Sequence, residues 1–451
     1  MAESDFPDTP PALADFWSIP EPEREELLLR GILDAHAYHY EHNTAYRNTV
    51  AARGVGPCLT PAELPRVLRT TSQGFKSYID ILGTPFAQDR AADFAEWLTE
   101  NTSLDLRSRP HRFRSRYRSV ESLLKTVEHA YEAFGLEVLT SSGTSGRVAF
   151  IPRDRQTSKL AGESFSLSLQ RYLGIQADHT AIFMTPKRTR IATARMARAG
   201  VRRVGLTTDR IHFTVPFPAS PDRVRVATGL TYRRGLRGGM ERRIWHPLMR
   251  FAKERLVDAQ AVESAISHLI PATAHEEKVL IFGNPADLHG IASFLLDSGR
   301  TMTLSPGSLL VTEGGLDRAH SKIAVEIRRD LQEAFRLPDG DPVPVRDVYA
   351  MAEAAWAAMQ CRYGNYHVPP WVLAVTLDDE EAFQTAPRST GLLAFYDPFG
   401  GDAFPAFFRT TDQVTLVKGM TCPCGEKGDY VEEASILRVD LPGQAGCAGR
   451  I

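Results

Sequence analysis

Hydrophobic and polar positions along the chain follow two different rhythms. Up to about residue 135 the pattern is helical, and the clearest amphipathic stretch is EPEREELLLRGILDAHAYHYEHN. From residue 136 short apolar runs alternate with helical stretches, and the clearest runs are DHTAIFMTP, EKVLIFGNP and GSLLVTEGG. This alternation predicts an α/β fold with a substantially parallel sheet, in which ligands bind at the carboxyl ends of the strands.

The same pattern divides the chain into three parts. Residues 1–135 are expected to form a mainly helical N-terminal segment, and residues 136–412 an α/β core. Residues 413–451 form a short tail rich in cysteine and glycine, which is too small for a large domain of its own.

Composition narrows the function. The chain has 451 residues, of which 43% are hydrophobic and 24% charged, with a net charge of −2. This balance argues against a general nucleic-acid-binding protein, which carries a basic excess. One stretch, 107–124, is rich in arginine; it reads as a solvated surface or loop, or alternatively as a docking patch for an acidic partner.

Two sequence patterns, a membrane span and a signal peptide, bear on where the protein is located. Its apolar runs are too short to span a bilayer, and the first residues, MAESDFPDTPPAL, do not have the pattern of a signal peptide. We therefore expect a cytoplasmic protein without a membrane span, whose thiols are reduced. An odd number of cysteines then favours metal binding or chemistry over a disulfide framework; they are Cys58, Cys361, Cys422, Cys424 and Cys447.

An unbroken series of hydroxyls and glycines lies between two apolar runs, in LTSSGTSGRVAFIPRD. Glycines allow the backbone to approach an anion closely, and serine and threonine add neutral donors. The loop is not a Walker A loop because no Gly-Lys-Ser/Thr follows it. It is a candidate phosphate-binding loop, with a flexible turn as the alternative; its residues are Ser142, Gly143, Thr144, Ser145 and Gly146.

The order of the segments resembles that of the adenylate-forming enzymes. Their phosphate loop reads much like SSGTSG, and their glutamate motif has its counterpart in YAMAE, residues 349–353, with Ala350 where glycine is usual. Their ribose-binding aspartate has its counterpart in FRTTDQV, and their adenine-binding backbone in the EGG of 313–315.

More narrowly, the chain resembles the acyl-protein synthetases (LuxE type) of bacterial bioluminescence operons and, more distantly, the phenylacetate–CoA ligases. Seven motifs lie in the family's order between about 75 and 447: GFKSY, SSGTSG, VTEGG, YAMAE, GNYHVPPW, FPAFFRTTDQV and CPCG. The chain departs from the family where LDR replaces the usual Trp-Lys after the glycine pair, and at Ala350. The resemblance implies the large N-terminal domain of an adenylate-forming enzyme with a shortened C-terminal region.

The resemblance also implies an activity and a set of residues. ATP and Mg²⁺ activate a carboxylic acid, possibly a fatty acid, as an acyl-adenylate. Glu353 would hold Mg²⁺, Asp412 the ribose hydroxyls, Tyr349 the adenine ring, and Gly314 and Gly315 the adenine edge. Glu353, Asp412 and Tyr349 have structural alternatives: a helix-start glutamate, a strand-end turn residue and a core aromatic, respectively.

The acceptor of the acyl group is a thiol in the same family. Cys447 matches the family's acylated cysteine near the C-terminus, with an incidental cysteine in the tail as the alternative. Coenzyme A, a reductase and an acyl carrier protein are the other thiol acceptors. An amine or hydroxyl acceptor, or a non-catalytic nucleotide-binding scaffold subunit, remains an alternative function.

Four residues fit a closed tetrahedral zinc site: Cys361, His367, Cys422 and Cys424. Three thiols and one imidazole leave no position for water, so such a site is structural and would attach the tail to the main domain. Similar positions occur in the relatives named above. The alternative is a core cysteine, a histidine at a strand end and a reduced cysteine pair.

Overall fold

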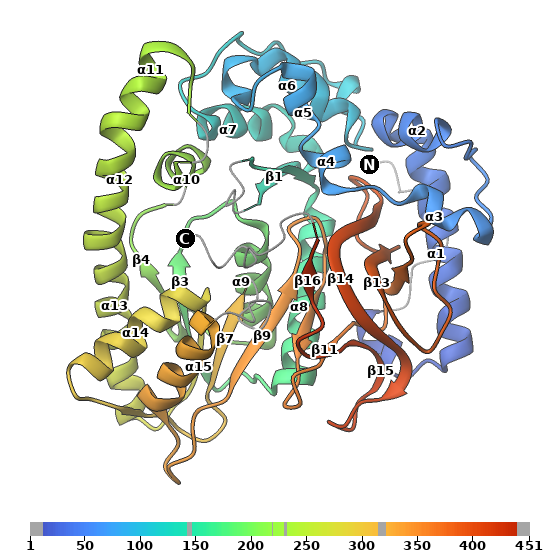
Figure 1. Cartoon of the computed structure of the whole chain (residues 1–451). Coiled ribbons are helices and arrows are strands. Elements are labelled where there is room, and N and C mark those ends of the chain that lie inside the picture. Colours follow the sequence, from blue (N-terminus) through green and yellow to red (C-terminus); the bar gives the residue numbers. More distant parts are fainter. Residues whose placement is uncertain (1–11, 142–146, 219, 230–231, 314–321, 440–451) are drawn as a thin grey trace.

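The computed structural model describes residues 12–141, 147–218, 220–229, 232–313 and 322–439. The chain begins with seven helices that cover one end of the molecule (Figure 1). The longest, α1, has acidic residues in its first turn and histidines in its last, which suits the helix dipole. The helices are α1 (Glu21–His42), α2 (Thr44–Ala51), α3 (Leu64–Val67), α4 (Thr71–Phe75), α5 (Tyr78–Leu82), α6 (Ala91–Glu100) and α7 (Val120–Ala130).

A large mixed sheet of 12 strands runs through the rest of the chain. In one half, five strands are parallel in the order β9-β7-β5-β3-β4. They are β3 (His179–Pro186), β4 (Ile211–Val215), β5 (Lys278–Gly283), β7 (Leu309–Glu313) and β9 (Val345–Ala350).

The other half of the sheet is antiparallel, from β9 outward. Its strands are β10 (Ala357–Gln360), β11 (Tyr366–His367), β12 (Leu373–Leu377), β13 (Arg388–Asp397), β14 (Ala406–Thr421), β15 (Lys427–Val431) and β16 (Leu437–Arg438). The predicted α/β fold is confirmed, but the sheet is parallel only in part. The short links after β9 leave no room for crossover helices, so these strands pair antiparallel.

Helices cover both faces of the parallel strands, as such sheets require. On one face α8 (Arg155–Leu173) and α9 (Ala192–Val204) pack on the sheet in one hydrophobic cluster, around Phe165 and Phe282. On the other, α13 (Asp258–Ala274), α14 (Pro285–Asp297) and α15 (Lys322–Ala334) form a second cluster, around Leu269 and Leu331. Two short strands, β6 (Met302–Thr303) and β8 (Phe335–Arg336), pair outside the main sheet.

A separate hairpin frames the hydroxyl-rich loop. Its strands, β1 (Glu137–Thr140) and β2 (Phe150–Arg153), are antiparallel. The Thr140 amide donates to the Arg190 carbonyl at 2.8 Å, just after β3 ends. The hairpin therefore lies at the carboxyl edge of the parallel strands, where the sequence predicts ligands to bind.

Three further helices, α10 (Pro221–Thr228), α11 (Gly235–Met240) and α12 (His246–Ala252), lie between β4 and α13. None of the helices in the described part of the chain is long and apolar enough to cross a bilayer.

Candidate active site and Cys-His cluster

Glu353 lies in the turn that joins β9 to β10, at the carboxyl edge of the parallel strands. Its side chain is 5% exposed. Burial raises the pKa of Glu353, while a hydrogen bond from Thr71 and the charges of Lys76 and Arg153 favour its ionised form. An ionised carboxylate is the kind of ligand that Mg²⁺ prefers, and the magnesium role of Glu353 stays a prediction.

Arg153 holds this turn in place. It ends β2, and its Nη2 donates to the carbonyl oxygens of Ala352 at 3.0 Å and Ala354 at 2.6 Å. These carbonyls belong to the residues on either side of Glu353. Arg153 is 2% exposed, and burial lowers its pKa to about 10. The hairpin that carries the hydroxyl-rich loop is thereby joined to the glutamate turn.

Sequence reasoning missed Arg153, because an arginine at a strand end is by default a surface residue. The one signal in the sequence was its position: Arg153 comes directly after the apolar run VAFIP, residues 148–152, which contains no polar side chain.

Replacing Arg153 with Met is expected to lower the free energy of unfolding by about 3 kcal/mol, because two buried carbonyls lose their donor. Arg153→Lys keeps the charge but offers a less extended donor, so its loss should be smaller. Urea denaturation of both variants beside the wild type measures this. A loss below about 0.5 kcal/mol for Arg153→Met would show that the clamp is not formed in solution.

Asp412 and Tyr349, the predicted ribose-binding and adenine-binding residues, are in direct contact. The Tyr349 hydroxyl donates to Asp412 Oδ2 at 2.9 Å, which joins β9 to β14. Asp412 is 8% exposed, and it lies opposite Arg438 where β14 and β16 run antiparallel. The Tyr349 ring belongs to a buried hydrophobic cluster, so its adenine-stacking role stays a prediction.

Hydrogen bonds between buried polar side chains connect the strands next to Tyr349 and Asp412. Asp347 on β9 accepts from the Thr312 hydroxyl at 2.5 Å and from the Tyr366 hydroxyl at 2.9 Å. Glu313, the last residue of β7, is partly exposed, and desolvation of its carboxyl group raises its pKa to about 7. Neither acid was singled out from the sequence, since nothing in their local pattern distinguishes them from strand-end carboxylates.

Several predicted residues lie outside the described part of the chain. They are Ser142, Gly143, Thr144, Ser145 and Gly146 of the phosphate loop, Gly314 and Gly315 of the adenine edge, and Cys447. Their roles stay predictions. The described base of the loop is closed by Ser141, whose amide donates to the Ala149 carbonyl at 3.2 Å and whose hydroxyl accepts from the Ala149 amide at 3.0 Å.

Another buried acid, Asp397, ends β13. Burial raises its pKa to about 7, against the opposing effects of the Phe399 amide and Arg153. The carboxyl group of an aspartate in an unfolded chain has a pKa near 4. Between about pH 4 and pH 7, Asp397 therefore keeps its proton in the folded protein but has lost it in the unfolded chain. Its contribution to stability is therefore present below about pH 4 and is lost as the pH rises toward 7.

Asp397→Asn removes this titration. We expect the melting temperature to fall less between about pH 4 and pH 7 in the variant than in the wild type. Thermal unfolding followed by circular dichroism at four pH values measures the difference. Parallel curves for the two proteins would contradict a protonated, buried Asp397.

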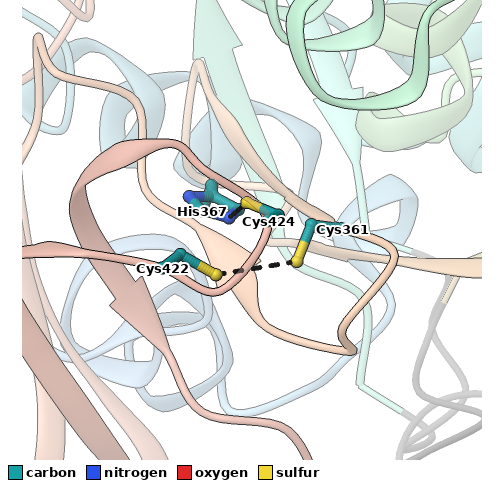
Figure 2. A group of neighbouring side chains, drawn as sticks. All are labelled: Cys361, His367, Cys422 and Cys424. Atoms are coloured by element: carbon teal, nitrogen blue, oxygen red, sulfur yellow. Dashed lines mark hydrogen bonds between the residues drawn. The ribbon is translucent and has the colours of Figure 1, made fainter.

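The four predicted zinc ligands come together at the other end of β14. Cys361 follows β10, His367 lies on β11, and Cys422 and Cys424 lie in the turn between β14 and β15 (Figure 2). All four ligand atoms lie within 4.8 Å of one another. Cys361 Sγ is 3.9 Å from Cys422 Sγ, and Cys424 Sγ is 3.3 Å from His367 Nε2.

The environment of this Cys-His cluster suits a metal. Burial lowers the pKa of His367 to about 4, which keeps the imidazole neutral and able to act as a ligand. The Tyr172 ring stacks on it, with centroids 4.8 Å apart and planes at 12°. Cys58, by contrast, is exposed and is not part of the cluster.

Comparison with known proteins gives a family match for the C-terminal part of the chain. Residues 253–451 match the family model described as acyl-protein synthetase, LuxE. A long-chain-fatty-acid–luciferin-component ligase from Aliivibrio fischeri is 26% identical over 194 residues, which are 41% of this chain and 48% of that protein. The chain therefore aligns with about half of this relative's length.

Solved structures extend the likeness to nearly the whole chain. A 2-hydroxyisobutyryl-CoA ligase in its postadenylation state, with its acyl-adenylate, has a TM-score of 0.54 at 13% identity; the match covers 97% of this chain and 72% of that one. The same ligase in an open conformation gives a TM-score of 0.50 at 12% identity, with 97% and 80% covered. This likeness shows that the fold is that of the adenylate-forming ligases. The chain thus has the fold of the adenylate-forming ligases, and its residues 253–451 are similar to the acyl-protein synthetases of the LuxE family.

Proposed function

We propose that the protein uses ATP to activate a carboxylic acid as its acyl-adenylate and then transfers the acyl group to a thiol. The observation that carries this proposal is Glu353, a buried acid at the carboxyl edge of the parallel strands, held on both sides by Arg153. The family match and the fold support the same reaction class.

In the first step a carboxylate oxygen of the acid attacks the α-phosphorus of ATP. The bond from that phosphorus to the bridging oxygen breaks, and pyrophosphate leaves with the electron pair. A bound Mg²⁺ neutralises charge on the phosphate oxygens. The protein's part is to position and stabilise: Glu353 offers carboxylate oxygens to the cation, and the loop of Ser142, Thr144 and Ser145 offers donors to the phosphates.

Asp412 offers its carboxylate to the two ribose hydroxyls, a match of two acceptors to two donors. Tyr349 fixes the orientation of that carboxylate through the hydrogen bond to Oδ2. In the second step a thiolate attacks the acyl carbonyl carbon, and AMP leaves as the mixed anhydride breaks.

The products test this function. The purified protein, incubated with ATP, Mg²⁺ and a panel of carboxylic acids, should release AMP and pyrophosphate in the presence of an acid it accepts. Release of ADP and phosphate, or no nucleotide turnover with any acid, would contradict the proposal. The second outcome would favour the non-catalytic scaffold.

Cys447 is the proposed acyl acceptor within the chain, with coenzyme A or a protein thiol as the alternative. Mass spectrometry after turnover should show the acyl group on Cys447, and Cys447→Ser should abolish it. Cys58→Ser, which changes an exposed cysteine outside the cluster, is the matched control. Thioester formation on coenzyme A at an unchanged rate in Cys447→Ser would rule out the self-acylation route, and acylation of an added amine or alcohol would favour the other acceptor class.

We favour an acid with an apolar chain. The sequence contains arginines at 187–203 that could have lined a polar pocket, but the structure gives two of them structural partners. Arg190 pairs with Glu121 and Glu128 of α7, and Arg195 pairs with Glu137 of β1. The name of the relative from Aliivibrio fischeri also specifies a long-chain fatty acid. A chain-length series in the product assay tests this choice.

We further propose that the Cys-His cluster binds one structural Zn²⁺. Support comes from the three thiols and the neutral imidazole, whose ligand atoms already lie within 4.8 Å of one another. The ion would join the β10–β11 turn to the β14–β15 turn without taking part in the reaction.

A further inference from the structure

An unusually apolar surface lies on the rod-like helix at one flank of the molecule. The rod consists of α11, α12 and α13, which follow one another without a break (Figure 1). In its first half five large apolar side chains are between 51% and 92% exposed: Leu236, Met240, Ile244, Leu248 and Phe251. We call these five residues the apolar row.

The spacing of the apolar row puts its members on a common side of the helix. They follow one another at steps of four, four, four and three residues, which is the helical repeat. Wider helical turns at Glu241–Trp245 and Lys253–Val257 suit steps of four. The second half of the rod differs, because α13 buries Ala261, Ala265 and Leu269 against the rest of the fold.

Positive charge surrounds the apolar row. Between Tyr232 and Lys253 the chain has seven basic residues and one acidic residue, although its overall net charge is −2. The single acid, Glu241, pairs with Arg225 at 2.8 Å. The arginines in exposed positions are Arg234, Arg237, Arg242, Arg243 and Arg250. The surface therefore suits a partner that is both anionic and apolar.

A pocket of about 380 Å³ opens beside the row, between α10 and the rod. Its walls include Val226, Met240, Trp245 and Met249. Three arginines and two acids also line it, and one of the acids, Glu241, pairs with Arg225; the five are Arg223, Arg233, Arg237, Asp222 and Glu241. Apolar walls beside guanidinium groups that outnumber the acids fit an amphipathic anion, in which a hydrocarbon chain adjoins a charged head.

We propose that residues 235–256 dock on the surface of an anionic phospholipid bilayer. The helix would lie in the plane of the interface, with the apolar row inserted and the arginines at the headgroups. A second copy of the chain is disfavoured as the occupant, because it would bring two basic surfaces together. An acidic protein is disfavoured because the row stands on one exposed helix and the adjoining pocket has the chemistry of a lipid site.

Docking would bring the protein to the phase in which a long-chain acid dissolves. That consequence rests on the proposed function, but the docking itself does not. The test therefore contains neither ATP nor a carboxylic acid substrate, so its outcome is independent of whether the adenylation proposal holds.

Vesicle flotation tests the docking. The full chain should float with phosphatidylcholine vesicles that contain phosphatidylglycerol, at least about tenfold more than with pure phosphatidylcholine, and high salt should weaken the binding. The triple variant Ile244→Ser, Leu248→Ser, Phe251→Ser should lose binding about tenfold or more. The matched control changes three exposed apolar residues elsewhere, Ile81→Ser, Phe294→Ser and Val325→Ser, and should bind normally.

Tryptophan fluorescence gives a second readout of the same surface. Trp245 is 47% exposed and lies beside the row, whereas Trp97, Trp356 and Trp371 are buried. A blue shift on adding anionic vesicles, absent in Trp245→Phe, is expected.

Four results would overturn the proposal. The first is no flotation with anionic vesicles at low salt, and the second is equal flotation of the triple variant and the wild type. The third is a dimer in light scattering that the triple variant dissolves while vesicles do not bind, which would identify a second copy as the occupant. Binding of polyglutamate in preference to vesicles would likewise overturn it in favour of an acidic protein.

Discussion

Glu353→Gln is expected to lower acid-dependent AMP formation at least about 100-fold, the order of effect of removing a charged group that stabilises a transition state. The substitution keeps the volume and one oxygen but removes the charge that would hold Mg²⁺. Burial already raises the pKa of this acid, so its ionised form is disfavoured by the fold, and the neutral amide should fold as well as the wild type. The measurement is the rate of AMP release, together with thermal unfolding.

Asp429→Asn is the matched control for this variant. Asp429 on β15 is a partly buried acid with a raised pKa, and desolvation is again the largest cause. It accepts a hydrogen bond from the Gly419 amide and is not one of the residues grouped around Glu353. Its variant should keep the rate. Equal rates for Glu353→Gln and the wild type would remove Glu353 from the reaction, and with it the observation on which the proposed function depends.

The second large effect is expected on thermal stability, when the proposed zinc ion is lost. Cys422→Ala should reduce bound zinc to near zero and lower the melting temperature by about 5 °C or more, because a structural metal couples its binding energy to folding. Removal of the metal by a chelator should have the same effect on the wild type. Metal analysis by mass spectrometry and thermal unfolding measure the two quantities.

Cys58→Ala changes an exposed cysteine outside the cluster and should leave both quantities unchanged. The zinc proposal fails if the purified wild type holds less than about a tenth of an equivalent of zinc and Cys422→Ala melts at the wild-type temperature.

The sequence was informative about features that depend only on the type of residue and on its spacing along the chain. The buried strands β3, β5 and β7 come from apolar runs, and their alternation with helices gives the parallel half of the sheet. The four proposed zinc ligands are a second case: a Cys-x-Cys pair and a Cys-x5-His pair, 61 residues apart at Cys361 and Cys422, meet in the structure. Whether they hold zinc stays a prediction.

The sequence was less informative where the surroundings decide the role of a residue. Arg153 and Asp397 resemble ordinary strand-end residues, and only their burial shows that one clamps the glutamate turn and the other holds a proton. Arg190 lies in an arginine-rich stretch that would ordinarily be exposed to solvent. In the structure it forms ion pairs with two glutamates of a helix more than sixty residues earlier. Long-range pairings of this kind leave no periodic signal.

The most direct test of the account is the exchange of labelled pyrophosphate into ATP. Formation of an acyl-adenylate is reversible, so the protein should incorporate label into ATP when Mg²⁺ and an accepted carboxylic acid are both present, and not when either is left out. No exchange with any acid of a broad panel, from protein that is folded and binds ATP, would contradict the central claim.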